Sequence, residues 1–375
     1  MAHGRIRLRR MLLSLKVNSL EANARPCCVA QLAKIAGETM KITTLTTNAA
    51  AVLTLSIGLA HAQAPTPPGF DFAKMRAEVE AFNKKPDTVG TGKYPALKEM
   101  VDSLPNHVIY RPADLSMLGK EKLGVLAWGN GGCAADGAGG RFHLSEIASH
   151  GYLAIASGTI QSGPGAPPRP AGEAPPGPPA LGANGMPLHI PPPATKSALL
   201  TEGIDWALAE NQRKGSPYYG RINPRWIAVS GWSCGGLQAL EVAADPRVRT
   251  VIIHSSGIFA DANPMPGITI TKAALQKLHT PIIYILGGPS DIAYANGLDD
   301  FKRINSVPVF VANLDVGHGG TFMEPNGGRE AAVAVSWLDW QLKGDAGAGK
   351  LFVGADCGLC KDREWKVDSK DISAQ

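Results

Sequence analysis

The chain has 375 residues, 44% of them hydrophobic, with 37 Lys/Arg against 32 Asp/Glu and a formal net charge of +5. Residues 1–62 hold eight basic and two acidic residues, which leaves 29 basic and 30 acidic residues in 63–375, a net charge of −1. Because the basic excess belongs to the first 62 residues, the charge gives no indication of a nucleic-acid partner.

Residues 1–62 are predicted to be a leader with a signal peptide. Met40-Lys41 begins a short basic region, residues 49–59 form an apolar run, and Ala60-His61-Ala62 supplies a cleavage site before Gln63. The apolar run is too short for a transmembrane helix, so no membrane span is expected in the mature chain. We expect the true start at Met40; an unusually long basic region and a buried helix of the mature fold are the alternatives. Export would place the mature protein outside the cell or in the periplasm.

The mature chain is expected to form one α/β domain over residues 63–345, followed by a tail over 346–375. Short apolar strands alternate with amphipathic helices, which predicts a mainly parallel sheet with helices on both faces. The expected strands are His107–Arg111, Leu123–Trp128, Leu153–Ser157, Trp226–Ser230, Val248–His254, Ile282–Leu286 and Val309–Leu314. The expected helices are Phe72–Asn83, Leu144–His150, Lys196–Arg213, Leu237–Ala244, Ala273–Leu278, Ala293–Ile304 and Arg329–Leu342.

A glycine-rich loop follows the second expected strand, with the sequence Gly129-Asn130-Gly131-Gly132-Cys133. Enzymes that transfer acyl groups stabilise a developing oxyanion with two backbone N–H groups, and one of them commonly comes from a loop of this kind. Asn130 or Gly131 is the expected donor. A glycine turn that serves only chain reversal is the alternative.

The segment from Ser162 to Pro193 contains twelve prolines and shows no apolar periodicity. Proline lacks a backbone donor and fixes φ, so neither a helix nor a strand ladder is expected here. The segment follows the C-terminal end of a strand, where α/β sheets bind ligands. It is interpreted either as a loop at the mouth of a site or as a disordered surface loop.

Gly231-Trp232-Ser233-Cys234-Gly235 lies between a strand pattern and a helix pattern, the context that a G-x-S-x-G nucleophile elbow requires. The tight turn presents the serine hydroxyl above the sheet, and the glycines leave room for the backbone. Ser233 is therefore the candidate nucleophile, and the N–H of Cys234 is the candidate first donor to the oxyanion.

A serine nucleophile needs a base and an acid that orients the base, and in this context they follow the serine in the order acid, then histidine. His318 lies in a glycine loop after the last expected strand and is the candidate base, ahead of His254 and His279. Asp291 lies on the loop after the preceding strand and is the candidate acid. Asp315 is its main competitor, whereas Asp299 and Asp300 lie within a helix pattern.

Export to an oxidising compartment favours disulfides. Cys27 and Cys28 leave with the leader, and the four remaining cysteines allow three pairings: Cys133, Cys234, Cys357 and Cys360. The loop 129–133 and the elbow 231–235, which are expected to supply the two oxyanion donors, each carry a cysteine. If they lie side by side, the two cysteines could pair, so a Cys133–Cys234 bridge is hypothesised, with Cys357–Cys360 as a local second bridge. A redox motif or half a zinc site is the other interpretation of the C-x-x-C pair.

With these residues assigned, the chain resembles the α/β-hydrolase superfamily over about residues 105–345. The stretch 231–236 is similar to the G-W-S-x-G-G elbow of cutinase-like and polyester-hydrolysing enzymes, and the short histidine loop resembles that of dienelactone hydrolases and chlorophyllase-like esterases. Dienelactone hydrolases have a cysteine in place of Ser233, and bacterial polyester hydrolases typically have an aromatic residue in the loop where this chain has Asn130. Trp232 is expected either to bind the acyl group of a substrate or to belong to the core.

The resemblance implies an exported serine esterase that forms an acyl-enzyme on Ser233. Its substrate would be a small-molecule or polymeric ester, and neither a metal ion nor an organic cofactor is expected. The same residues would also serve an amidase, a peptidase or an acyltransferase. A catalytically inactive fold used for binding is the alternative from another class.

Overall fold

The computed structural model describes residues 72–168, 192–261 and 265–373. The chain divides into two units, Met1–Ala62 and Gln63–Gln375, and all described residues belong to the second. The predicted leader, with Met40 and the cleavage site, lies outside the described residues. So does most of the proline-rich segment.

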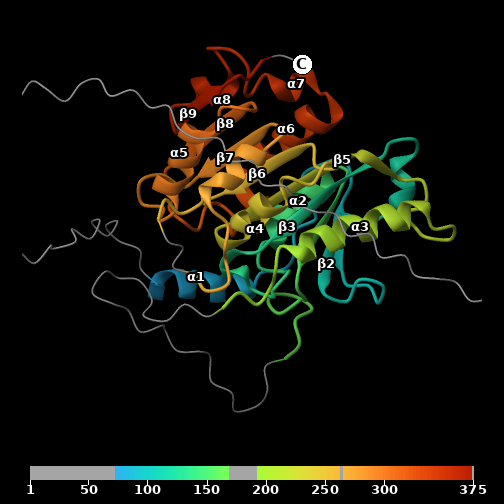
Figure 1. The fold of residues 1–375 in the computed structure, drawn as a ribbon. Helices are drawn as coiled ribbons and strands as arrows, with labels where there is room; N and C mark the ends of the chain where they lie inside the picture. The colour runs from blue at the N-terminus through green and yellow to red at the C-terminus, as the bar shows by residue number, and fades with distance from the viewer. Residues whose placement is uncertain (1–71, 169–191, 262–264, 374–375) are drawn as a thin grey trace, which may run out of the picture. The chain divides into compact units, whose positions relative to one another are not determined.

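A nine-stranded sheet forms the centre of the described chain (Figure 1). Its six central strands, in the order β4-β3-β5-β6-β7-β8, are parallel. At one edge β2 runs antiparallel to β4 and β1 runs antiparallel to β2, and at the other edge β9 runs antiparallel to β8. The predicted α/β class with a mainly parallel sheet is therefore confirmed. The strands are β1 (Ala96–Glu99), β2 (His107–Pro112), β3 (Leu123–Gly129), β4 (Tyr152–Ser157), β5 (Ile222–Trp232), β6 (Thr250–His254), β7 (Ile282–Leu286), β8 (Val309–Leu314) and β9 (Trp365–Lys370).

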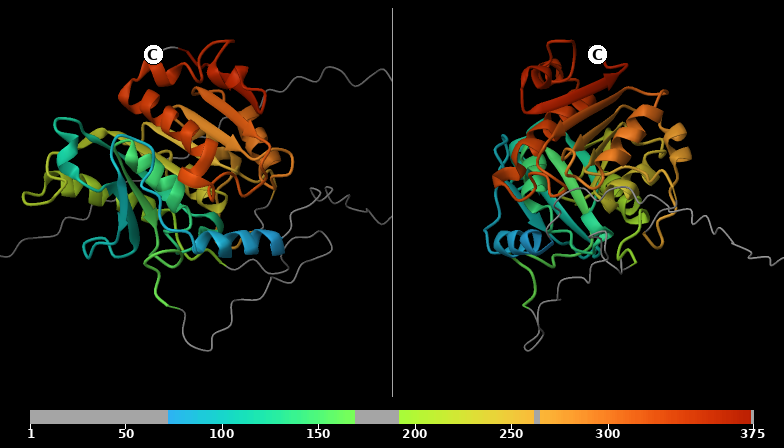
Figure 2. Two further views of the ribbon diagram at one scale, coloured as in Figure 1. Left: turned by 180° about the vertical axis from the view of Figure 1, so that it is seen from behind. Right: turned by 90° about the vertical axis from the view of Figure 1, so that its left-hand side faces the viewer.

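Helices cover both faces of this sheet (Figure 2). Buried side chains of α3, α4 and α5 join one hydrophobic cluster, and those of α2 and α6 join the other. The α-helices are α1 (Phe72–Asn83), α2 (Arg141–Ser149), α3 (Ala198–Gln212), α4 (Cys234–Val242), α5 (Tyr294–Arg303), α6 (Gly328–Lys343), α7 (Ala346–Gly349) and α8 (Gly358–Lys361).

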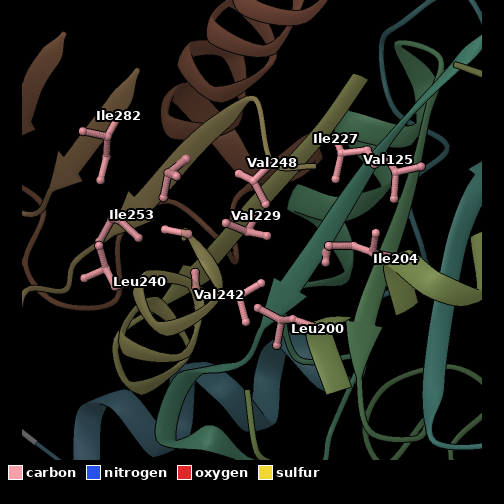
Figure 3. Packing of buried hydrophobic residues seen from close by; sticks show 14 of the residues in the cluster. Val125, Leu200, Ile204, Ile227, Val229, Leu240, Val242, Val248, Ile253 and Ile282 are labelled. Carbon is pink, nitrogen blue, oxygen red and sulfur yellow. The ribbon is translucent and has the colours of Figure 1, made fainter. Parts of the chain in front are cut away.

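Side chains of the central strands alternate between the two clusters. On β3, Val125 and Ala127 pack with α3 and α4, whereas Leu126 and Trp128 point to the face of α2 and α6. Figure 3 shows the first cluster, in which Val125 lies among residues of β5 and α3. A strand covered on both faces must be apolar at every position, which explains the unbroken apolar runs in the sequence.

Three expectations about the elements were wrong. The tail after residue 345 is not separate from the sheet, because it supplies the edge strand β9. The expected helix Ala273–Leu278 is a 3₁₀ helix, η3 (Lys272–Lys277). Finally, β5 begins at Ile222 rather than Trp226, and it includes a proline near its start, where the pairing with β3 is irregular.

Candidate active site

Ser233 occupies the single position between β5 and α4, with φ 54° and ψ −121°. A residue other than glycine rarely adopts a positive φ, and such strained positions cluster at functional sites. Its backbone is fixed by three hydrogen bonds. The N–H of Ser233 donates to the carbonyl oxygen of His254 (3.0 Å), and its own carbonyl accepts from the N–H of Gly236 (2.9 Å) and from Ser256 Oγ (2.7 Å).

Glycines make this sharp turn possible. A Cβ on Gly231 would collide with the carbonyl oxygen of Gly235, and a Cβ on Gly235 would collide with the carbonyl group of Gly129. The end of β3 and the start of α4 therefore touch through their backbones, which brings the loop after β3 against the elbow.

The three residues predicted as a triad lie together. His318 Nε2 is 2.9 Å from Ser233 Oγ, and His318 Nδ1 is 2.6 Å from Asp291 Oδ1. An ionised carboxylate only accepts hydrogen bonds, so in the neutral imidazole the proton is assigned to Nδ1. Nε2 is then the acceptor that faces the serine hydroxyl, which is the arrangement a general base requires.

Asp291 is buried at the C-terminal end of β7, with 2% of its surface exposed. Burial alone would raise its pKa, but hydrogen bonds from His318, Ala293 N–H (2.9 Å) and Gly287 N–H (3.1 Å) outweigh burial and lower it. The carboxylate is therefore ionised at neutral pH and held in a fixed orientation. Its competitor, Asp315, is exposed on the loop after β8.

The other candidates from the sequence lie elsewhere. His254 is buried on β6 and His279 is exposed before β7. Asp299 and Asp300 both form ion pairs with Lys272. The serine hydroxyl instead faces His318, and His318 in turn faces Asp291, so the structure favours the predicted set.

Two of the residues predicted as oxyanion donors, Cys234 and Gly131, stand at the starts of helices. Cys234 is the first residue of α4, and a first-turn N–H has no acceptor within its own helix. Gly131 likewise begins η2 (Gly131–Cys133), with Asn130 as its N-cap. The side-chain amide of Asn130 donates to the carbonyl oxygens of Ala134 (2.9 Å) and Ser157 (2.6 Å), so this side chain holds the loop in shape.

A disulfide joins these two loops. Cys133 and Cys234 are bonded, with their Cα atoms 5.2 Å apart, and both are buried. The carbonyl oxygen of Cys133 accepts from the N–H groups of Ala194 and Thr195, both at 3.0 Å. Gln238 of α4 in turn donates to the carbonyl oxygen of Thr195 (2.8 Å). The chain that leaves the proline-rich segment is thus tied to the loop after β3 and to α4.

The second disulfide links Cys357 and Cys360, with a Cα–Cα distance of 4.9 Å. Both pairings are those hypothesised from the sequence. Among the residues that the structure describes, no group of three or more His, Cys, Asp or Glu is arranged to hold a metal ion.

Trp232 takes part in holding the histidine loop. Its indole Nε1 donates to the carbonyl oxygen of His318 (2.8 Å), and its ring centroid lies 5.4 Å from that of Phe322. Phe322 also contacts the rings of two buried histidines, His143 and His254. The indole is only partly buried, so the structure gives it a packing role and leaves part of its surface open.

Sequence reasoning missed the groups beneath this loop. Phe322, His143 and Glu330 come from three separate segments, and only the fold brings them together. Burial lowers the pKa of His143 to about 3, so it is neutral. Glu330 in the first turn of a helix has the pattern of an ordinary exposed helix-start charge. For Phe322 and Glu330 the one available signal was that they closely follow His318 in the sequence, whereas His143 gave none.

Within the described ranges, no helix combines the length and apolar character needed to cross a membrane. Comparison with protein-family models gives no match, and comparison with curated proteins gives no significant match.

Proposed function

We propose that the protein is an exported serine hydrolase with an α/β-hydrolase fold that cleaves carboxylic esters through an acyl-enzyme. The observation that carries this proposal is the hydrogen-bonded chain Ser233–His318–Asp291 at a strained strand-to-helix turn. Fold class alone would not carry it, because one fold hosts many functions. Geometry and residue types together match the requirements of nucleophilic acyl transfer.

In the first half-reaction His318 Nε2 takes the proton of Ser233 Oγ as the oxygen attacks the ester carbonyl. The N–H of Cys234 and that of Asn130 or Gly131 stabilise the oxyanion of the tetrahedral intermediate. The buried Asp291 carboxylate orients the imidazolium and stabilises its charge. His318 then donates its proton to the leaving alcohol as the C–O bond breaks, and the acyl group stays on Ser233.

In the second half-reaction water takes the place of the alcohol. His318 removes a proton from the water, the resulting hydroxide attacks the acyl carbonyl, and the same N–H groups stabilise the second oxyanion. Collapse of this intermediate returns the proton to Ser233 Oγ and releases the carboxylic acid. Every proton passes through His318, so the mechanism needs no further catalytic group.

The test is covalent labelling together with substrate turnover. A fluorophosphonate should label the wild-type protein but not Ser233→Ala, and Ser233→Ala should lower kcat for p-nitrophenyl esters by a factor on the order of 10⁶. Ser290→Ala is the matched control, because Ser290 is an exposed serine on the neighbouring loop after β7, and it should keep both properties. Absence of labelling in the wild type would favour an inactive binding fold.

The leaving group and the acyl acceptor distinguish an esterase from the closest alternative functions. An amidase, a peptidase or an acyltransferase would use the same three residues. Turnover of p-nitroanilides without turnover of the matching esters would reject the esterase proposal. Ester turnover that yields mainly a transferred acyl product in the presence of an alcohol would favour an acyltransferase.

Export is supported by the two disulfides, since such bonds persist in oxidising compartments. The proposal is that cleavage after Ala62 gives a mature protein that begins at Gln63 and lies in the periplasm or outside the cell. Sequencing the N-terminus of the mature protein tests it, and a first residue upstream of position 62 would contradict it.

A further inference from the structure

Glu330 is a buried acid that the proposed mechanism does not use. It lies in the first turn of α6 with 1% of its surface exposed. Its carboxyl Oε2 accepts from the N–H of Thr321 (3.2 Å), and its own N–H donates to Thr321 Oγ1 (3.1 Å). Thr321 Oγ1 in turn donates to the carbonyl oxygen of Gly327 (2.7 Å). Two reciprocal hydrogen bonds thus join the start of the helix to Thr321.

The loop that Glu330 holds is the one that carries His318. Thr321 is three residues after the histidine, and Gly320 between them has φ 54°. A Cβ on Gly320 would collide with Glu330 Oε2, so the carboxyl group packs directly against the loop backbone. The carboxyl group is therefore one of the contacts that hold the loop of His318, beside the hydrogen bond from Trp232.

The charges around Glu330 disfavour its ionised form. Burial disfavours it most, the carboxyl groups of Asp291 on the loop after β7 and Glu324 on the loop before α6 add to this, and only the Thr321 N–H favours a carboxylate. Oε1 has no hydrogen-bond partner among the described residues. A buried carboxylate without a cation is costly and would have to gain water, and an opening between α6 and the Gly320 backbone that packs against it would admit that water.

We propose that Glu330, as a neutral carboxylic acid, is a positioning residue that fixes the loop of His318, and that its ionisation releases this loop. This inference rests on the proposed function, because His318 is assumed to be the base. Burial raises the pKa of Glu330 to about 8, which places the release just above neutral pH. Activity would then be lost on the alkaline side for a reason unconnected with the state of His318.

The first test is the pH dependence of kcat for a simple acetate ester, followed by acid release in a pH-stat. The kcat of the wild type should fall above pH about 8. Glu330→Gln stays neutral, so its kcat should begin to fall only at a pH at least one unit higher. Glu324→Gln keeps Glu330 but removes one of the carboxyl groups that disfavour its ionisation, so it should keep the alkaline loss at the same or a slightly lower pH. An alkaline loss at the same pH in Glu330→Gln would overturn the proposal.

Glu330→Leu tests the positioning role at neutral pH. It removes the acceptor of the Thr321 N–H and should lower kcat about tenfold with KM changed less than about twofold, the size expected when a buried donor is left unpaired. Glu330→Gln retains an acceptor and should rescue most of this loss. Equal losses in the Gln and Leu variants would contradict a hydrogen-bonding role.

A stability measurement tests the neutral state without using activity. The pKa of Glu330 is raised from an ordinary value of 4.5 to about 8, so the folded protein holds a proton that the unfolded chain releases between these values. The contribution of Glu330 to the free energy of unfolding is therefore complete below pH 4.5 and is lost as the pH rises to about 8. The Tm of Glu330→Gln minus that of the wild type should therefore increase by several degrees from pH 5 to pH 8. A Tm difference that is the same at pH 5 and pH 8 would contradict the proposal that Glu330 is a neutral acid in the folded protein. Absence of ester turnover in the wild type would instead reject the proposed function.

Discussion

Gly129 and Gly235 meet backbone to backbone at the centre of the candidate site. A Cβ on Gly235 would collide with the carbonyl group of Gly129, and one on Gly129 would lie 2.6 Å from the carbonyl oxygen of Gly235. This approach places the loop after β3 beside the first turn of α4. The two loops proposed to supply the oxyanion donors are neighbours because neither glycine carries a side chain.

Gly235→Ala should therefore damage both stability and catalysis. The new methyl group must push the backbone of β3 away from α4, which should cost about 1–3 kcal/mol or more in the free energy of unfolding. The same shift moves the N–H of Cys234 and should lower kcat. Gly319→Ala is the control, because a Cβ there meets no atom within 4 Å. Urea unfolding and ester kinetics measure both effects, and a Gly235→Ala protein as stable as the wild type would contradict the close contact.

Removal of the Cys133–Cys234 bridge should have a larger effect than removal of Cys357–Cys360. The first closes a loop with a sequence separation of 101 and the second a separation of 3. Loop-closure entropy gives about 4.7 kcal/mol for a loop of roughly 100 residues and about 2 kcal/mol for the short one.

The comparison uses two double variants, Cys133→Ala/Cys234→Ala and Cys357→Ala/Cys360→Ala, in urea unfolding and in ester kinetics. The first should also lose kcat by about tenfold or more, since the bridge holds a proposed oxyanion donor. The second lies in the segment between α7 and β9 and should keep kcat. Equal kcat in both variants would mean that the bridge does not position the donor.

Asp291→Asn should lower kcat by about 10⁴ with little change in KM. The amide fits the same space, but its NH₂ group favours the wrong tautomer of His318, with the proton on Nε2. That tautomer cannot accept the proton of Ser233. Asp315→Asn is the control, because Asp315 is exposed three residues before His318. It should keep kcat within about twofold, and a large loss there would reassign the acid.

Much of the sheet could be predicted because its central strands are buried on both faces. Ile282–Leu286 and Val309–Leu314 are continuous apolar runs, and the observed strands have the predicted bounds. The edge strands lack this signal. On β9 only Trp365 and Val367 are apolar, and the strand alternates with polar residues as an exposed edge does. Asn223-Pro224 is a pair typical of turns, yet it lies inside β5, which begins at Ile222, four residues before the predicted strand.

The candidate site was predictable where chain order and loop position define it. Ser233, Asp291 and His318 each follow a strand whose C-terminal end lies at one edge of a parallel sheet, and the structure brings them within hydrogen-bond distance. The supporting groups were not predictable. Phe322 and Glu330 look like an ordinary loop phenylalanine and an ordinary helix-start acid. Their burial under the histidine loop arises only from the packing of α6 against the sheet.

Trp232→Phe tests how the indole acts on the site. The structure gives Trp232 Nε1 a hydrogen bond to the carbonyl oxygen of His318, so loss of the N–H should loosen the histidine loop. We expect kcat to fall about fivefold, the equivalent of about 1 kcal/mol for one hydrogen bond, with similar KM for short and long acyl groups. Kinetics on a series of p-nitrophenyl esters from acetate to octanoate measures both constants. A KM that rises steeply with acyl length while kcat stays constant would instead show that the indole binds the acyl group.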